Sequence, residues 1–452
     1  MRDPQAMSAP PGTPPASGVA GDRSTVAAEW RAHWPMVLAA FVGISVPIVP
    51  YFTLGLFFEP LSAEFGWSRT LISAGGSIAA AVAIPLSPFI GALIDRWGVR
   101  YLALAGLVLT TVTLACFSLA NGSHAQWLAF WATFAVVGLM LKTTIWTAAI
   151  NHAFDAGRSM ALAVTMAGIT FCHIIAPPIA QWLVDGYGWR DAYLFLAIGW
   201  GIPAFTLSLL FLRDVRGGGG GHRSHHDGGD KASSDLPGLT IHQALRSVAL
   251  WRVGIATFLT LLFSSTLTIH KVPLLTEAGV ARETAAWLTS LSGVAGFAGL
   301  MMTGWLMDRF KAGLIGGITN GAMALSLVML LEPFRTPTLI VISMVVAGYA
   351  GGTKLQINAF LTVRYAGMRN YGKIYGVMAS LIACTGVLGP VFGGLMYDLT
   401  GNYTLLILAA IPASAMAGLL LIGLGPYPQW SPSPNDDASI PDPGLKEGRV
   451  RR

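Results

Sequence analysis

Long apolar stretches without a charged residue alternate with short polar segments along most of the chain. Eleven such stretches lie between residues 32 and 435, and a membrane-spanning helix needs about 20 apolar residues. The stretch 101–141 is too long for one helix and contains the polar turn Asn121-Gly122-Ser123-His124, so it holds one span and most of another. The pattern predicts twelve spans, at 35–58, 70–93, 101–120, 125–149, 159–183, 191–212, 250–273, 284–306, 312–331, 336–362, 373–397 and 402–424.

Composition and charge placement support a membrane protein. Hydrophobic residues make up 54% of the chain and charged residues 11%, whereas an ordinary soluble domain is about 25% charged. Of the 28 Lys and Arg, 21 lie on the side of both termini, 5 on the opposite side and 2 within spans. This positive-inside pattern predicts that both termini are cytoplasmic. The net charge of +6 therefore indicates membrane topology and no nucleic-acid partner.

The sequence predicts neither a metal site nor a cofactor. The three cysteines all fall in apolar spans, which excludes a disulfide framework and favours small core residues. His173, in span five, is expected to be a hydrogen-bonded core histidine. We find no ATP-binding glycine loop and no hydrolase or metalloprotease motif in context, so the chain is not expected to be an enzyme.

Five segments are predicted along the chain. They are a disordered cytoplasmic tail at 1–30, a six-helix bundle at 31–212, a flexible cytoplasmic linker at 213–248, a second six-helix bundle at 249–425 and a disordered tail at 426–452. The two bundles are related by an offset of 213 residues, because Gly91-x-Leu93-x-Asp95-Arg96 recurs as Gly304-x-Leu306-x-Asp308-Arg309. Parallel repeats of this kind are typical of transporters whose halves rock about a central site.

Two lysines lie inside predicted spans, Lys142 in span four and Lys354 in span ten. All 22 Asp and Glu residues fall in loops, tails or span ends, so neither ammonium group has an acidic partner at its depth. An isolated ammonium inside a membrane is costly and tends to lose its proton or to recruit an anion. The lysines therefore indicate a site for a mono- or dicarboxylate, with extension of each side chain to the interface as the alternative.

Further candidate substrate-binding residues follow from their positions. Trp146 and Asn358 lie four residues after the two lysines and so on the same helical faces, and Tyr51 lies in span one. His270 and Lys271 end span seven on the outside, where they form either a vestibule for anions or a simple interfacial anchor.

The segment Gly91-Ala-Leu-Ile-Asp95-Arg96-Trp-Gly98-Val-Arg100 resembles the loop signature of the major facilitator superfamily, with Asp308-Arg309 as a degenerate second copy. The resemblance implies an all-α integral membrane protein with twelve transmembrane helices in two pseudo-symmetric six-helix bundles. It also implies that spans one, four, seven and ten line a central cavity, where Lys142 and Lys354 would face one site from opposite halves.

A finer resemblance is to the monocarboxylate transporter and oxalate/formate antiporter branch. It is carried by Gly55-Leu-Phe-Phe-Glu-Pro-Leu, by Val272-Pro-Leu-Leu-Thr-Glu-Ala-Gly279 and by Gly389-Pro390-x-x-Gly393-Gly394. The branch usually carries an Arg in span eight and a Lys in span one, and this chain has neither. Its substrate anchors are therefore not transferred to this sequence.

A conformational latch is expected at the cytoplasmic side. Asp95 would lie at the positive N-terminus of a helix in the other half and hold one conformer. The candidate latch residues are Gly91, Asp95, Arg96, Gly98, Arg100, Arg158, Asp308 and Arg309.

Together these features predict a secondary active transporter that moves a small organic anion by alternating access, with proton symport favoured over anion exchange. The alternative is an exporter of drugs or neutral solutes on the same fold, which would need an acidic group in the first or fourth span. We expect a monomer in the lipid bilayer of the bacterial inner membrane. A receptor is not favoured, because the chain has no sizeable sensory domain.

Overall fold

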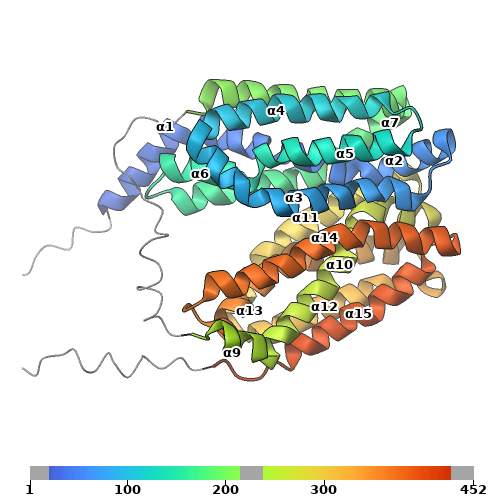
Figure 1. The fold of residues 1–452 in the computed structure, drawn as a ribbon. Helices are drawn as coiled ribbons and strands as arrows, with labels where there is room; N and C mark the ends of the chain where they lie inside the picture. Colours follow the sequence, from blue (N-terminus) through green and yellow to red (C-terminus); the bar gives the residue numbers. More distant parts are fainter. Residues whose placement is uncertain (1–19, 214–237, 429–452) are drawn as a thin grey trace, which may run out of the picture.

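The computed structural model describes residues 20–213 and 238–428, and helices account for nearly all of them. They form two halves that lie against each other (Figure 1). The N-terminal half contains α1 (Ala20–Ser45), η1 (Val46–Ile48), α2 (Val49–Phe65), α3 (Arg69–Trp97), α4 (Val99–Cys116), η2 (Phe117–Leu119), α5 (His124–Gly138), η3 (Leu139–Leu141), α6 (Thr143–Ala153) and α7 (Arg158–Phe211). The C-terminal half contains α9 (Ile241–Arg246), α10 (Val248–Glu277), α11 (Arg282–Arg309), α12 (Ala312–Val328), η4 (Glu332–Phe334), α13 (Pro337–Ala366), α14 (Tyr371–Thr400) and α15 (Thr404–Ile422).

All twelve predicted spans are present in the described residues. Ten helical segments are long and apolar enough to cross a membrane. One of them, α7, contains two spans, because Gly188 adopts a φ of 81° and turns the chain inside a segment of 54 residues. The apolar helix α12, with 17 residues, supplies the remaining span.

Span four is interrupted where the sequence predicted one continuous helix. The short η3 follows α5, Lys142 then adopts extended backbone with a ψ of 150°, and α6 begins at Thr143. Span one also contains an irregular turn, η1, where Pro47 has no N–H to give to a helical hydrogen bond. Side chains on either side of each interruption therefore do not follow one helical face.

Two segments outside the predicted bundles contain helix. Helix α1 begins at Ala20, inside the segment 1–30 that was expected to be a tail. In the described part of the expected linker, α9 forms because Thr240 and Gln243 make a reciprocal capping box. The tail residues 1–19 and 429–452 and the linker residues 214–237 lie outside the described residues.

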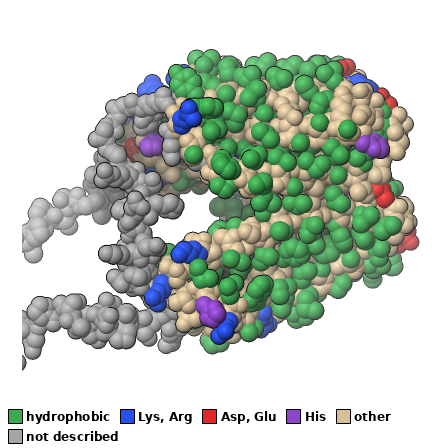
Figure 2. Space-filling view, viewed as in Figure 1, with side chains coloured by type: hydrophobic (Ala, Val, Ile, Leu, Met, Phe, Trp, Pro, Cys, Tyr) green, Lys and Arg blue, Asp and Glu red, His purple; other side chains and the backbone are tan. Residues whose placement is uncertain are grey.

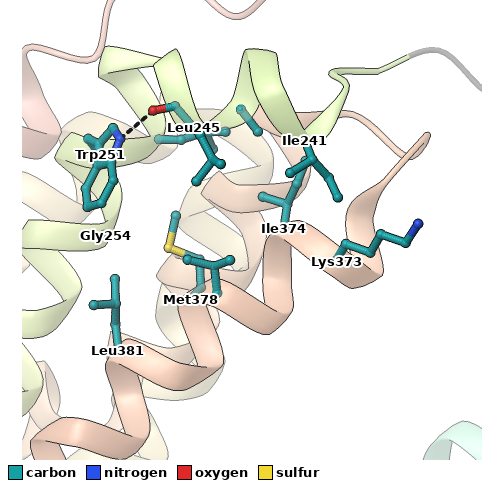
Figure 3. Close-up of a pocket in the computed structure, with 11 residues that line it drawn as sticks. Ile241, Leu245, Trp251, Gly254, Lys373, Ile374, Met378 and Leu381 are labelled. Carbon is teal, nitrogen blue, oxygen red and sulfur yellow. Dashed lines mark hydrogen bonds between the residues drawn. The ribbon is translucent and has the colours of Figure 1, made fainter.

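Helix α9 packs against the C-terminal half over a small apolar pocket (Figure 3). Ile241 and Leu245 of α9 cover Met378 and Leu381 of α14, and the pocket has a volume of about 40 Å³. The indole N–H of Trp251 donates to the Leu245 carbonyl at 2.7 Å. These apolar contacts and the hydrogen bond hold α9 against α10 and α14. We therefore interpret the pocket as a packing contact.

We call the end of the molecule where α7 ends and α9 begins the linker end, and the end where α3 begins and α14 ends the far end (Figure 1). Across the two halves, α2 packs on α10, α3 on α14 and α7 on α11. The packing is closest toward the far end, since a Cβ on Gly55 would lie 2.5 Å from the Ile269 carbonyl oxygen and one on Gly394 would lie 2.6 Å from the Thr70 Cα. Figure 2 shows a hollow between the halves at the linker end.

Candidate functional site

A central cavity of about 370 Å³ lies between the two halves. Helices α2 and α7 line it from the N-terminal half, and α10, α11 and α13 line it from the C-terminal half. Its polar and aromatic lining includes Phe52, Thr170, His173, Ser264, Thr268, Lys271, Ser292 and Lys354. Two of the predicted site residues, Lys271 and Lys354, are therefore brought into one cavity.

Lys354 reaches the cavity because α13 lies unusually close to α11. A Cβ on Gly348 would lie 2.3 Å from the Ser292 carbonyl oxygen, and one on Gly352 would lie 2.1 Å from that of Gly296. Small residues at such a crossing let two helices approach closely in a membrane. The Lys354 ammonium then extends toward α10 and donates to the Ser264 hydroxyl.

Lys271 lies inside α10 and not at its end. The predicted span stops at residue 273, but α10 continues to Glu277, so Lys271 keeps its place on a helical face. Its ammonium donates to the Ser292 hydroxyl of α11 at 2.7 Å. Lys271 therefore faces the same cavity as Lys354, from a neighbouring helix of the same half.

The N-terminal half supplies an aromatic wall. The rings of Phe52 and His173 stack with their centroids 4.2 Å apart and an interplanar angle of 9°. His173, which the sequence placed in the core, lines the cavity and also lies beside Gly293 of α11. Ile169 extends this wall with an aliphatic side chain.

Lys142 and Tyr51 lie in a neighbouring cavity of about 410 Å³ within the N-terminal half. The Lys142 ammonium is exposed and donates to the Ser87 hydroxyl at 2.7 Å. Ile169 lines both cavities. In this conformer Lys142 and Lys354 thus line adjacent cavities, whereas the sequence placed them in one.

Trp146 and Asn358 do not line the central cavity. Trp146 is fully buried against Gly43, with its indole N–H donating to the Leu141 carbonyl at 3.0 Å. The break at Lys142 explains this, since the rule that residues four apart share a face holds only along an unbroken helix. Asn358 is buried and donates from Nδ2 to the Thr257 hydroxyl at 2.8 Å, which ties α13 to α10.

His270 also points away from the central cavity. It is fully buried, and its Nε2 lies 2.9 Å from the Pro390 carbonyl oxygen, which can only accept a hydrogen bond. In the neutral ring, Nδ1 then accepts from the Tyr403 hydroxyl at 2.9 Å. The Tyr403 oxygen in turn accepts from Nη1 of Arg69 at 2.9 Å, so His270 supports a contact between the halves.

Two arginines close the far end. Arg69, the first residue of α3, stacks on the Tyr397 ring at 3.8 Å, and Asp398 accepts the backbone N–H groups of Arg69 and Thr70 at 3.0 and 2.9 Å. Arg282, the first residue of α11, donates to the Leu56 carbonyl of the other half at 2.7 Å and lies 3.4 Å from a Glu59 oxygen. Both arginines line a vestibule of about 680 Å³ at this end.

The predicted latch residues lie at the linker end. Gly98, with a φ of 82°, joins α3 to α4, and Arg100 donates to the Leu209 carbonyl at 2.8 Å. Arg158 pairs with Asp155 at 2.7 Å and Arg309 stacks on Trp305 at 3.9 Å, so each of these two contacts stays within one half. Arg96 and Asp308 are exposed. The burial of Gly91 and the side chain of Asp95 are not described by the structure.

Sequence reasoning missed Phe52, Ser264 and Ser292 as cavity residues. Nothing in their local pattern distinguishes them from other small or aromatic residues of apolar helices. The sequence did contain a signal for the true end of span seven. Helices often end just before a glycine, and Gly279, with a φ of 85°, follows shortly after the end of α10 at Glu277. Extending span seven to this glycine would have placed Lys271 within the membrane.

Comparisons with known proteins agree with this architecture. The model of the Major Facilitator Superfamily matches residues 34–275 and 253–449. Monocarboxylate transporter 13 of Bos taurus is 26% identical over 383 residues, which cover 82% of this chain and 84% of that protein. The solved nucleoside transporter NupG has a TM-score of 0.69 at 13% identity and covers 86% of this chain and 99% of its own. The inward-open xylose transporter XylE from E. coli has a TM-score of 0.67 at 13% identity, with coverages of 88% and 97%.

Proposed function

The chain belongs to the Major Facilitator Superfamily, a class of multi-pass membrane transporters and not of enzymes, and on this premise we propose that it moves a small organic anion by alternating access. The observation that carries the proposal is the pair of ammonium groups, Lys271 and Lys354, in one cavity between the halves. The similarity to a monocarboxylate transporter supports a carboxylate as the substrate.

The environment of the two lysines favours an anion over a neutral solute. Their hydrogen-bond partners are the uncharged hydroxyls of Ser292 and Ser264, and the residues that line the cavity include no Asp or Glu. Keeping ammonium groups in such a site without a counter-charge is costly. A bound carboxylate provides the counter-charge and accepts hydrogen bonds from both lysines.

The conformer fits one state of an alternating-access cycle. Toward the far end the halves are joined by Arg69, Asp398 and Arg282, and at the linker end they enclose a hollow (Figure 2). Breaking the far-end contacts while the linker end closes would expose the cavity to the opposite side. We place the linker end and both termini in the cytoplasm, and we propose that the protein acts as a monomer in the bacterial inner membrane.

Proton symport is our proposal for the coupling. The sequence has no carboxylate at mid-membrane depth, so the proton would travel on the substrate itself, on a lysine that loses its proton or on His173, which lines the cavity. Exchange of one anion for another is the alternative and needs no proton carrier. A pH gradient across the membrane distinguishes the two modes.

The test is uptake of labelled mono- and dicarboxylates into proteoliposomes, with and without a pH gradient. We expect saturable uptake in the wild type and at least a tenfold lower rate in Lys271→Gln and Lys354→Gln, because each change removes a charge-assisted hydrogen bond of about 1.5–3 kcal/mol. Lys311→Gln, an exposed lysine of the α11–α12 loop, is the matched control. If no carboxylate is transported, or if both variants transport normally, export of neutral solutes becomes the better explanation.

A further inference from the structure

The two cations of the central cavity belong to the same half. Lys271 is on α10 and Lys354 is on α13, and both line the cavity of about 370 Å³. Each donates to a serine hydroxyl on a neighbouring helix, Lys271 to Ser292 and Lys354 to Ser264. Their geometry is therefore fixed by neutral partners that leave both positive charges uncompensated.

A substrate with one negative charge would neutralise only one of these lysines. The second ammonium would remain half-buried in the same cavity, whose lining contains no acidic side chain. An ammonium group left without a counter-charge at membrane depth is costly. Two negative charges on one small molecule satisfy both lysines at once.

The opposite wall has a different character. Phe52 and His173 present a stacked aromatic pair, Ile169 continues it on the same half, and Phe297 and Leu300 add apolar surface from α11. A cavity of this volume lies within the range of about 300–1,000 Å³ that is usual for small-molecule sites. At these positions the N-terminal wall is aromatic and aliphatic, whereas the C-terminal wall carries both lysines together with Phe297 and Leu300.

We propose that the substrate is a dianion with an apolar body, whose two acidic groups bind Lys271 and Lys354 while its apolar part lies against Phe52 and His173. This inference rests on the proposed function and narrows it from organic anions in general to one class. The chemistry that recognises the ligand is a pair of carboxylates joined to a hydrocarbon or aromatic group.

Two matched pairs of probes test the inference. Benzylmalonate and 3-phenylpropanoate share a phenyl group and differ by one carboxylate, and malonate is benzylmalonate without the aromatic group. Binding is measured as protection of the detergent-solubilised full chain against thermal unfolding, because a ligand of the folded state raises the melting temperature. Uptake of the same labelled compounds into proteoliposomes is measured in parallel. We expect benzylmalonate to bind at least about tenfold more tightly than either 3-phenylpropanoate or malonate.

Variants separate the role of each lysine from a loss of folding. Lys271→Gln and Lys354→Gln should each weaken benzylmalonate at least about tenfold and change 3-phenylpropanoate by less than about threefold, so that the preference for the dianion disappears. Lys271→Arg keeps the charge and should retain the preference, whereas Lys311→Gln, at the exposed linker end, should behave as the wild type.

The outcomes are distinguishable from failure of the proposed function. If 3-phenylpropanoate binds as tightly as benzylmalonate and depends on only one lysine, the dianion inference is overturned and transport of organic anions stands. If malonate binds as tightly as benzylmalonate, the part of the proposal that places an apolar group against Phe52 and His173 is overturned. If none of these or the other carboxylates binds or is transported, the proposed function itself fails.

Discussion

The position of Lys354 depends on the glycines beside it. Gly348 and Gly352 bring the backbone of α13 against that of α11 at Ser292 and Gly296, and from this position the Lys354 ammonium donates to Ser264 of α10. Gly351, the residue next to Gly352, has nothing within 4 Å of the place where its Cβ would lie. Adjacent glycines of the same helix thus have different roles.

This difference gives a prediction at the residue scale. Gly352→Ala should lower the free energy of unfolding by about 2 kcal/mol, because the added methyl group meets the Gly296 carbonyl and forces α13 away from α11. Gly351→Ala should change stability by less than about 0.5 kcal/mol. Thermal unfolding of the two variants in the same detergent measures both values, and equal melting temperatures would contradict the packing described for Gly352.

The candidate residues could be found from the sequence only in part. Lys354 and Lys271 stood out, because a charge inside or beside an apolar stretch is visible without a structure. Trp146 followed from helical spacing and was placed in the wrong environment by the break at Lys142. His173 was expected in the core, and its place opposite the lysines depends on how α7 packs against α11.

At the element scale, the far end is closed by two equivalent positions. Arg69 and Arg282 differ by the repeat offset of 213 residues, and each is the first residue of its helix, α3 or α11. Each side chain crosses to the other half, where Arg69 contacts Tyr403 and Arg282 contacts Leu56. Each half therefore contributes one arginine from the start of an equivalent helix, and that arginine donates a hydrogen bond to the other half.

Removing both arginines should open the far end. In the Arg69→Ala, Arg282→Ala double variant, labelling of an introduced Thr268→Cys by an impermeant maleimide from the far side should become about tenfold faster, because two hydrogen-bonded contacts that exist only in the closed state are lost. The labelling background is a variant without Cys116, Cys172 and Cys384.

Arg190→Ala is the matched control for this experiment. Arg190 also forms a far-end salt bridge, at 2.6 Å with Glu64, but both residues belong to the N-terminal half. Labelling of Thr268→Cys in this variant should match that of the parent. If the double variant is labelled no faster than Arg190→Ala, the arginines do not hold the far end closed.

The spans themselves were predictable, since each is a charge-free apolar stretch of sufficient length. Their interruptions were harder to predict. Gly138 and the β-branched Thr143-Thr144-Ile145 around Lys142 are weak helix formers, but such residues are also common inside unbroken membrane helices. The repeat offset of 213 residues does predict that Arg69 and Arg282 occupy equivalent positions in the two halves. What the repeat alone could not tell is that these side chains cross between the halves.

At the scale of the whole molecule, the predicted latch lies at the linker end, and in the part of the chain that the structure describes the ion pair of Arg158 and the ring contact of Arg309 each stay within one half. This arrangement agrees with a latch that forms only when the linker end closes. The two ends would then be held in turn, the far end by the arginines and the linker end by the repeated pairs Asp95-Arg96 and Asp308-Arg309.

Weakening the latch should therefore favour the conformer described here. Asp308→Asn removes a negative charge that would interact with the positive end of a helix, worth about 0.3–1 kcal/mol, and should raise labelling of Thr268→Cys from the linker side by about two- to fivefold. Lys311→Gln, three residues away and exposed, is the control. Slower labelling in Asp308→Asn than in the control would assign the residue to the opposite state.

The placement of both cavity lysines in the C-terminal half has a consequence for the whole transport cycle. If the halves move as rigid bodies, the distance between Lys271 and Lys354 stays the same in every state, because α10 and α13 move together. The electrostatic well for the substrate then travels unchanged with one half. The aromatic wall of Phe52 and His173 belongs to the other half, so it is the part that approaches and withdraws. The two lysines would then determine how tightly the substrate binds, and withdrawal of the aromatic wall would determine when it is released.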